Sequence, residues 1–490
     1  MRSKLSIWLL LFLVPVGGQV DQSDMAADLA EAFTFTKYPT YARYDSMMHS
    51  IAAAHPEICA IDTFGTSIGG RLLLALKISD NVHETEDEPA VLITSTMHGD
   101  ELVGMVLSLR LADFILSSYG SDAEINHVVD DLELWINPLS NPDGTYANDR
   151  DTSMALSVRY NLNGRDLNRN FPDPGAGDPD DTTGVQPENR HMMQFMHRHA
   201  FNLSANIHSG TEVVNYPWDH KFTLHPDDNW YRLISHEYAD LAHDVDPTYM
   251  MGFDNGITNG AEWYVITGGR QDYVNYYLRG REVTLELSTV KKLPSELLDE
   301  HWNLNQWSLI SYIAQARYGI HGKVTNRANG NPVEAKIWVM DHDNDSSWVR
   351  SNAGHGSFYR YIKAGVYDLL VSAEGFLPDT VRNVPVTDYE TTRLEVMLDS
   401  LGTGVPGQEQ SAFSLYPNPA RNIIFVRSDR AFTPETVMEI FTVEGRVAGR
   451  QQLPTGARTH RVDVSGLARG IYFVKITGEN TTRQLSFVHY

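Results

Sequence analysis

The stretch "AVLITSTMHGDELVGMVLSLRLADFIL", residues 90–116, places a short apolar run directly before an amphipathic one. A short apolar run is typical of a buried strand, and apolar residues at helical spacing are typical of a helix packed on it. His98 and Glu101 stand where the strand gives way to the helix, the point at which α/β sheets gather functional groups. The stretch predicts a strand–helix unit of an α/β fold with two candidate metal ligands at its turn.

The spacing of His98 and Glu101 decides nothing without this context. The chain has 19 histidines, so about one His-x-x-Glu pair is expected by chance. A second copy, His83 and Glu86, lies in "NVHETEDEPA", an acidic stretch without apolar period that is typical of a solvated loop. Only the first copy follows a predicted buried strand, which makes it the candidate metal pair.

Composition narrows the class of protein. A chain of 490 residues with 42% hydrophobic content can bury a large core and is expected to form roughly two to four domains. The 63 Asp and Glu residues against 39 Lys and Arg give a net charge of −24, which argues against nucleic acid and anionic membranes as partners. Cys59, the single cysteine, cannot form an internal disulfide and is expected in the core.

The N-terminus has the features of a signal peptide. Residues 1–18, "MRSKLSIWLLLFLVPVGG", combine a basic start, an apolar run and a small-residue exit. We expect cleavage near Gly18 and a secreted or cell-surface protein. No later segment reaches about 18 uninterrupted apolar residues, so no membrane span is expected after processing.

The pattern of predicted helices and strands changes twice along the rest of the chain. Strand-like and helix-like runs alternate over residues 35–317, which predicts an α/β domain with a doubly wound, mostly parallel mixed sheet. Short alternating strands and tight turns over residues 318–400 predict a small all-β sandwich. Residues 401–412 are rich enough in glycine and polar residues to form a linker. Residues 413–490 predict a second all-β sandwich.

Two further polar residues belong to predicted strands of the first domain. His208 ends the strand in "NIHSG", and Glu286 lies in "TLELS". Together with His98 and Glu101, His208 makes the set of two imidazoles and one carboxylate that holds a catalytic zinc and leaves a fourth position for water. Zinc lowers the pKa of such a water to about 7, and a carboxylate base must then stand beside it. Glu286 is the preferred base, with Glu282 on the same strand face as a competitor.

Four other segments carry a family resemblance. They are "YPTYARYDSMM" (38–48), "FGTSIGGRLLLALKIS" (64–79), "NPDG" (141–144) and, most densely, "VRYNLNGRDLNRNFPD" (158–173). With the four candidate residues, these segments resemble the zinc metallocarboxypeptidase family, especially its regulatory branch, which includes carboxypeptidases D, E and N. The resemblance covers most of residues 35–400. It implies an exopeptidase that hydrolyses the C-terminal peptide bond of peptides and proteins.

The resemblance also implies a role for each matching residue. By similarity, one zinc ion per chain is bound by His98, Glu101 and His208, the scissile carbonyl is polarised by Arg159, the terminal carboxylate is held by Asn168 and Arg169, the substrate is covered by Tyr264, and the general base is Glu286. Asp166 would fix the tautomer of His98 from behind. A planar guanidinium suits the recognition of a free carboxylate, since it can donate two parallel hydrogen bonds.

The preferred substrate follows from two more positions. Asp219 stands eleven residues after His208, and Gln271 stands seven after Tyr264, as in the regulatory branch that this chain resembles. A carboxylate in a narrow, partly dry pocket pairs well with Lys or Arg and is left uncompensated by Phe or Leu. We therefore expect cleavage of C-terminal Arg and Lys.

The two β domains have resemblances of their own. Residues 318–400 resemble the transthyretin-like sandwich of the regulatory branch. "FSLYPNPARNIIFV" and "VDVSGLARGIYFVKI", in the last domain, resemble the C-terminal sorting domain of the type IX secretion system. This likeness implies the secretion machinery as a partner and export across an outer membrane, although the chain ends in "SFVHY" without a terminal lysine.

Two other functions stay open from the sequence. One is a different hydrolase on the same fold, such as a peptidoglycan amidopeptidase, which the residue at the base of the side-chain pocket would distinguish. The other is an inactive surface binding module. The intact set of candidate ligands, arginines and base argues against the second alternative.

Overall fold

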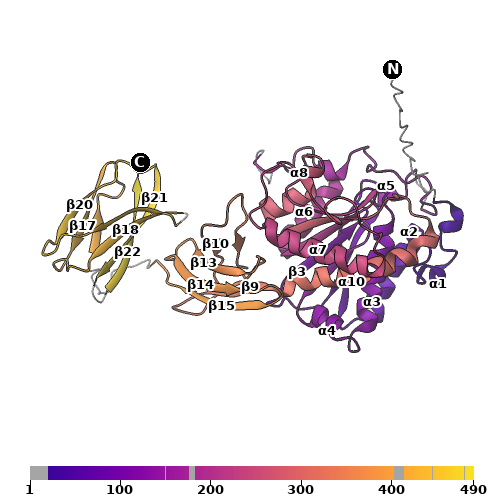
Figure 1. Ribbon diagram of the computed structural model, residues 1–490, viewed down its shortest axis with the longest axis horizontal. Coiled ribbons are helices and arrows are strands. Elements are labelled where there is room, and N and C mark those ends of the chain that lie inside the picture. Colours follow the sequence, from indigo (N-terminus) through magenta and orange to yellow (C-terminus); the bar gives the residue numbers. More distant parts are fainter. Residues whose placement is uncertain are drawn as a thin grey trace, which may run out of the picture.

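The structure is a computed structural model, and Figure 1 shows an α/β body followed by two β bodies. It describes residues 20–148, 151–175, 182–401, 413–443, 445–478 and 481–489. The predicted signal peptide, residues 1–18, lies outside the described residues. The predicted linker, residues 401–412, lies outside them except for Leu401.

The first body is built on an eight-stranded mixed sheet. Its strand order is β1 (Cys59–Thr66), β2 (Leu72–Ile78), β4 (Glu133–Asn137), β3 (Ala90–Ser95), β5 (Leu203–His208), β8 (Arg281–Ser288), β6 (Thr211–Tyr216) and β7 (Ile257–Asn259). The central strands β4, β3, β5 and β8 run parallel. β1, β2 and β6 add antiparallel pairings outside this centre. The predicted α/β mixed sheet is thereby confirmed.

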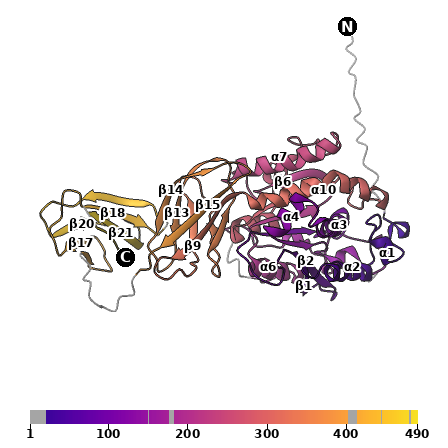
Figure 2. The same cartoon turned by 90° about the horizontal axis from the view of Figure 1, so that it is seen from below.

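Helices cover both faces of this sheet, because successive side chains of its buried strands point to opposite sides. Ile93 packs into the core on the face covered by α2 (Tyr41–Ala54), α3 (Val103–Ser118), α4 (Ala123–Asp130), α7 (Asp228–Val245) and α10 (Leu298–Ala314). Its neighbour Leu92 packs with Met192 and Phe195 of α6 (Pro187–His199) on the other face. Figure 2 shows α6 and α7 on opposite sides of this body. The sheet is therefore doubly wound, as predicted.

Short helices complete the first body. They are η1 (Gln22–Asp24), α1 (Leu29–Ala32), α5 (Pro142–Thr145), η2 (Leu167–Arg169), α8 (Gly260–Trp263), α9 (Arg270–Tyr273), η3 (Val274–Leu278), η4 (Ser295–Leu297) and η5 (Gln315–Arg317). The expected turn "NPDG" forms α5, because the Asn141 side chain accepts a hydrogen bond from the Gly144 amide and caps the helix. In the described part of the chain, no single helix meets the length and apolarity of a membrane span, although the sharply bent pair α3 and α4 does so jointly.

The strand register brings the candidate residues together. β3 ends at Ser95 and α3 begins at Val103, so His98 and Glu101 lie in the intervening loop. Ser95 stands opposite Ile207 in the parallel β3/β5 pairing, and His208 stands opposite Glu286 in the parallel β5/β8 pairing. Parallel strands present their carboxyl ends at one edge of the sheet, so all four side chains meet there.

The two β bodies each contain two small sheets. The second body has sheets β11-β10-β13-β14 and β12-β9-β15, with bounds β9 (Gly319–Asn326), β10 (Lys336–Val339), β11 (Val349–Arg350), β12 (Ser357–Arg360), β13 (Gly365–Ser372), β14 (Asp379–Val386) and β15 (Thr391–Leu398). The third has sheets β16-β17-β20 and β19-β18-β21-β22, with bounds β16 (Phe413–Tyr416), β17 (Ile423–Ser428), β18 (Val437–Thr442), β19 (Val447–Gln452), β20 (Thr459–Asp463), β21 (Gly470–Gly478) and β22 (Thr481–His489). Each body has its own apolar core, so the predicted pair of β-sandwiches is confirmed.

A buried ion cluster joins the first body to the second. Asp227, at the start of α7, forms ion pairs of 2.8 Å with Arg281 of β8 and with Arg360 of β12. His342 lies 2.8 Å from the same carboxylate, and Asp343 lies 2.6 Å from Arg360. Asp227, Arg281 and Arg360 are almost wholly buried, so this cluster fixes the junction with paired charges.

Candidate metal centre and substrate pocket

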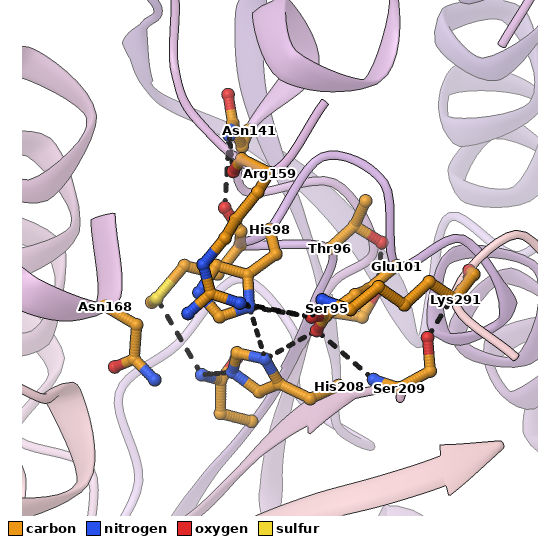
Figure 3. Close-up of polar contacts among 12 residues, drawn as sticks. Ser95, Thr96, His98, Glu101, Asn141, Arg159, Asn168, His208, Ser209 and Lys291 are labelled. Carbon is orange, nitrogen blue, oxygen red and sulfur yellow. Dashed lines mark hydrogen bonds and ion pairs between the residues drawn. The ribbon is translucent and has the colours of Figure 1, made fainter. Parts of the chain in front are cut away.

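Three buried side chains converge at the carboxyl edge of the sheet (Figure 3). Nδ1 of His98 lies 3.0 Å from Oε1 of Glu101, and Nδ1 of His208 lies 2.8 Å from Oε2. The two Nδ1 atoms are 3.0 Å apart. All three residues offer their ligand atoms within 4.8 Å of one another.

This donor set fits a zinc ion. Two imidazole nitrogens and one carboxylate are the ligands of an open catalytic zinc site. The opposite ring nitrogen of His98 already has a partner, since Nε2 lies 3.1 Å from the carboxylate of Asp166. A carboxylate that accepts this N–H orients a ligating imidazole and leaves its other nitrogen for the metal. Nε2 of His208 lies 2.7 Å from the side-chain amide of Asn206. A cation shared by both Nδ1 lone pairs accounts for the close approach of the two rings.

The electrostatics of Glu101 and His208 suit a cation, whereas burial of His98 is outweighed by the charge of Glu101 and the hydrogen bond with Asp166, so the pKa of His98 is raised. Burial raises the pKa of Glu101, but the charges of His98 and His208 outweigh burial and bring that pKa well below its ordinary value. Burial lowers the pKa of His208 to about 4. Metal binding requires an ionised carboxylate and a neutral imidazole, so Glu101 and His208 are in the correct protonation states at neutral pH.

Glu286 and Glu282, the two carboxylates predicted to share a strand face, have different surroundings. Oε2 of Glu286 is buried and has no hydrogen-bond partner among the described residues, and its side chain lines the pocket. Burial and the charge of Glu101 raise its pKa well above the ordinary value. Glu282 is fully buried in an ion pair of 2.9 Å with Arg270 and accepts a hydrogen bond of 2.6 Å from Ser204. Glu282 is thus committed to the fold, which favours Glu286 as the base.

Cationic and amide groups surround the ligands. Nη1 of Arg159 lies 3.2 Å from Nδ1 of His98, and Nε of Arg159 donates to Oδ2 of Asp166 at 2.8 Å. Asn168 and Arg169 lie in η2 and line the same pocket. Asp166 caps η2 by accepting from the Asn168 amide at 2.9 Å, so one carboxylate orients His98, Arg159 and η2 together.

The pocket, of about 190 Å³, is also lined by Asp219 and Asn215. Oδ1 of Asp219 accepts hydrogen bonds from Asn215 at 3.1 Å and Gln271 at 3.0 Å. Asn215 Oδ1 and Gln271 Oε1 are buried without partners among the described residues. Burial and the charge of Asp272 raise the pKa of Asp219 well above its ordinary value.

Two residues shape the space in front of Asp219. A Cβ on Gly260 would come within 1.8 Å of Oδ1 of Asp219, so only glycine leaves this part of the pocket open. Tyr264 also lines the pocket and is 48% exposed, at the rim. The structure therefore brings every predicted site residue to one pocket or directly behind it.

Lys291 and Asn215 are among the pocket residues that sequence reasoning missed. Lys291 forms an ion pair of 2.6 Å with Glu101, and Asn215 contacts Asp219. Lys291 follows the end of β8, a position at which functional groups gather, but the neighbouring Lys292 offers the same signal. Asn215 lies within β6, where an amide is equally typical of strand packing.

Comparisons with known proteins agree with this geometry. A zinc carboxypeptidase family model matches residues 44–308, and a secretion system C-terminal sorting domain model matches residues 414–488. Carboxypeptidase D of Homo sapiens is 34% identical over 355 residues, which cover 69% of this chain but only 25% of that protein. The carboxypeptidase N catalytic chain of Homo sapiens is 32% identical over 378 residues, with 69% of this chain and 81% of that chain covered.

Solved structures show the same fold. The crystal structure of thrombin activatable fibrinolysis inhibitor matches with a TM-score of 0.51 and 17% identity over 60% of this chain and 78% of that chain. The sequence resemblance, the shared fold and a donor set that suits zinc all lead to one assignment. The chain belongs to the zinc carboxypeptidase family and ends in a secretion system sorting domain.

Proposed function

We propose that this protein is a zinc-dependent exopeptidase that hydrolyses the C-terminal peptide bond of peptides and proteins and prefers C-terminal Arg or Lys. The observation that carries the preference is the buried carboxylate of Asp219, which lines the pocket. The names of the relatives, carboxypeptidases D and N, support cleavage at the carboxyl end.

The unpaired acceptors around Asp219 support a cationic side chain as the ligand. Asn215 and Gln271 each donate a side-chain N–H to Asp219. The side-chain carbonyl oxygen of each is buried and has no partner among the described residues. A guanidinium offers five N–H donors and an ammonium offers three, so either can satisfy these oxygens and the carboxylate together. A C-terminal Phe or Leu would leave the buried charge uncompensated, a state that proteins avoid.

The other pocket residues supply binding and proton transfer. Arg169 and Asn168 hold the free carboxylate of the substrate, and Tyr264 covers the bound residue from the rim. His98, Glu101 and His208 would hold a zinc ion, which would act as a Lewis acid and lower the pKa of a water molecule.

Glu286 and Arg159 act on the scissile bond. Glu286, on the strand next to His208, takes a proton from the attacking water and passes it to the leaving amine. Arg159 stabilises the oxygen of the scissile carbonyl as it gains negative charge, a contribution of about 3 kcal/mol for one well-placed donor. Asp166 holds both Arg159 and His98 in place.

We also propose roles for the rest of the chain. The sorting domain over residues 413–490 supports export to a secreted or cell-surface location, with the secretion machinery as a partner. The sandwich over residues 318–400 is proposed to be a transthyretin-like domain that stabilises the catalytic domain, residues 35–317, through the Asp227 cluster.

The experiment that tests the proposed activity uses the purified full chain and peptides that differ only in the last residue. Peptides ending in Arg or Lys are expected to lose that residue at least about tenfold faster than peptides ending in Phe or Leu, a difference of about 1.4 kcal/mol. A zinc chelator is expected to stop all release. Faster release of Phe or Leu than of Arg would refute the proposed preference.

A matched pair of variants locates the preference in the pocket. Asp219→Asn is expected to lower the Arg-over-Phe ratio by at least about tenfold, since loss of one member of a buried charge pair costs about 2 to 5 kcal/mol. Asp254→Asn, at a carboxylate that is 59% exposed in its pair with Arg232, is the control and is expected to keep the ratio. Equal ratios in both variants would return the pocket assignment to unknown.

A further inference from the structure

Lys291 enters the pocket beside the metal ligands. Its main chain is fixed, because its carbonyl oxygen accepts from the Leu102 amide at 3.0 Å and from Ser209 Oγ at 3.4 Å. Its side chain is 41% exposed and passes over Gly210, where an added Cβ would lie 3.3 Å from the lysine Cε. The lysine is thus anchored at its backbone and able to move at its charged end.

The ammonium group pairs with one oxygen of the candidate metal ligand Glu101. Nζ of Lys291 lies 2.6 Å from Oε1 of Glu101, and Glu101 is the only carboxylate paired with it among the described residues. An ammonium group and a divalent cation on one carboxylate repel each other. Metal binding at Glu101 would weaken this ion pair by repulsion and make the partly exposed ammonium group of Lys291 available to a substrate in the pocket.

Its position indicates which part of a substrate it meets. Figure 3 shows Asn168 and Lys291 on opposite sides of His98 and His208. Asn168 lies near the end that would hold the C-terminal residue, so the peptide on the N-terminal side of the scissile bond must leave the pocket past the ligands, toward Lys291. The residue just before the scissile bond is the first to reach it.

We propose that Lys291 determines specificity by binding an acidic side chain, Asp or Glu, on the residue immediately before the scissile bond. This inference rests on the proposed exopeptidase activity. Arg159 and Lys291 both line this part of the pocket, so a basic residue at that position is repelled by both. The enzyme would thus read two residues of opposite charge, a basic C-terminal residue in front of Asp219 and an acidic residue before it.

The test compares zinc-loaded full-length variants on peptides that end in Glu-Arg, Ala-Arg and Lys-Arg. Wild type is expected to show a kcat/KM about fivefold higher or more for Glu-Arg than for Lys-Arg, the effect of about 1 kcal/mol from a partly exposed ion pair. Lys291→Ala is expected to bring this ratio within about twofold of unity, and Lys291→Glu to reverse it. Lys292→Ala is the matched control, because Lys292 contacts the Ala155 carbonyl instead and should keep the wild-type ratio.

A binding measurement keeps the inference testable apart from turnover. Dissociation constants for the same peptides, measured on zinc-loaded Glu286→Gln, should follow the same order and lose it in the double variant with Lys291→Ala. An equal ratio in wild type and Lys291→Ala, in both measurements, would overturn the inference. If no peptide releases its last residue but the binding order holds, the proposed activity fails, and what is retained is the binding of an acidic penultimate residue by Lys291.

Discussion

Two buried carboxylate clusters of this chain differ in how their charges are satisfied. At the junction of the first two bodies, Asp227 has Arg281, Arg360 and His342 as partners, and Arg360 has Asp343 as well. Burial raises the pKa of Asp227, but the two arginines outweigh it and hold that pKa well below its ordinary value. In the pocket, burial and neighbouring carboxylates instead raise the pKa values of Asp219 and Glu286 well above the ordinary range.

The difference separates a structural cluster from a functional one. A buried charge that is fully paired stabilises one arrangement of the chain, whereas a buried charge without a partner costs folding free energy. The pocket keeps such a group, since Glu286 Oε2 and two neighbouring amide oxygens lack partners among the described residues. At the junction, the Nε atoms of Arg281 and Arg360 also lack partners, but both guanidinium groups are ion-paired with Asp227. Perturbed groups of this kind in a cleft mark sites whose partners arrive with the ligand.

The largest expected effect is on the chemistry of the pocket. Glu286→Gln keeps the shape of the side chain and removes the base, so kcat should fall by about 10³-fold. Zinc content, measured by elemental analysis, should stay at one per chain. Glu282→Gln should instead destabilise the fold, because it leaves the buried Arg270 with an incomplete partner. Turnover within tenfold of wild type in Glu286→Gln would place the base elsewhere.

A substitution in the junction cluster should change the free energy of unfolding and leave the catalytic chemistry unchanged. Asp227→Asn leaves the buried Arg281 without its charged partner and leaves Arg360 with Asp343 alone, so the free energy of unfolding should fall by about 3 to 5 kcal/mol in urea titrations. Asp254→Asn, in the exposed pair with Arg232, should change it by less than about 1 kcal/mol. A small effect in both variants would show that the junction is held by apolar packing alone.

The sequence predicted the pocket better than the junction. His98, Glu101, His208 and Glu286 could be found because each stands at or near the end of a predicted strand, and parallel strands bring such residues to one edge. Their agreement with a known family pattern then supplied the candidate residues that bind the substrate.

The residues that escaped prediction depend on contacts between distant segments. Asp227 meets Arg360 across 133 residues of sequence, and no local pattern marks either of them. Lys291 and Lys292 are adjacent and chemically identical, and only the path of the chain after β8 decides which one reaches Glu101. The sequence named both Glu282 and Glu286 and preferred Glu286, but the ion pair that occupies Glu282 could not be predicted, because it depends on where Arg270 lies.

Metal binding in the pocket should raise the free energy of unfolding of the protein. At a free zinc concentration of 100 times Kd, the metal should raise the free energy of unfolding by about 2.7 kcal/mol. His208→Ala should lose most of its zinc and with it most of this gain, measured by metal analysis and urea titration. His83→Ala, at the exposed loop copy of the motif, should keep both. Equal zinc loss in the two variants would refute the ligand assignment.

The smallest expected effect is on the pH dependence of the free energy of unfolding, to which the junction cluster and the pocket should contribute with opposite signs. The pKa of Asp227 is lower in the folded protein than in the unfolded chain, so its contribution is present above the ordinary pKa of about 3.9 and is lost as the pH falls through the folded value. Asp219 has a raised folded pKa, so the folded state holds its proton more tightly and stability declines as the pH rises above about 3.9. Each unit of pKa difference corresponds to about 1.4 kcal/mol.

Asp219→Asn should therefore have a higher free energy of unfolding than wild type at neutral pH, and this difference should grow between about pH 4 and 7. Asp227→Asn should have a lower free energy of unfolding than wild type, and this difference should shrink below about pH 4. Free arginine, by pairing with Asp219, should narrow the first difference and leave the second unchanged. Urea titrations of the three proteins across this range decide the matter, and parallel pH profiles for both variants would mean that the two clusters do not differ in the way their burial and partners indicate.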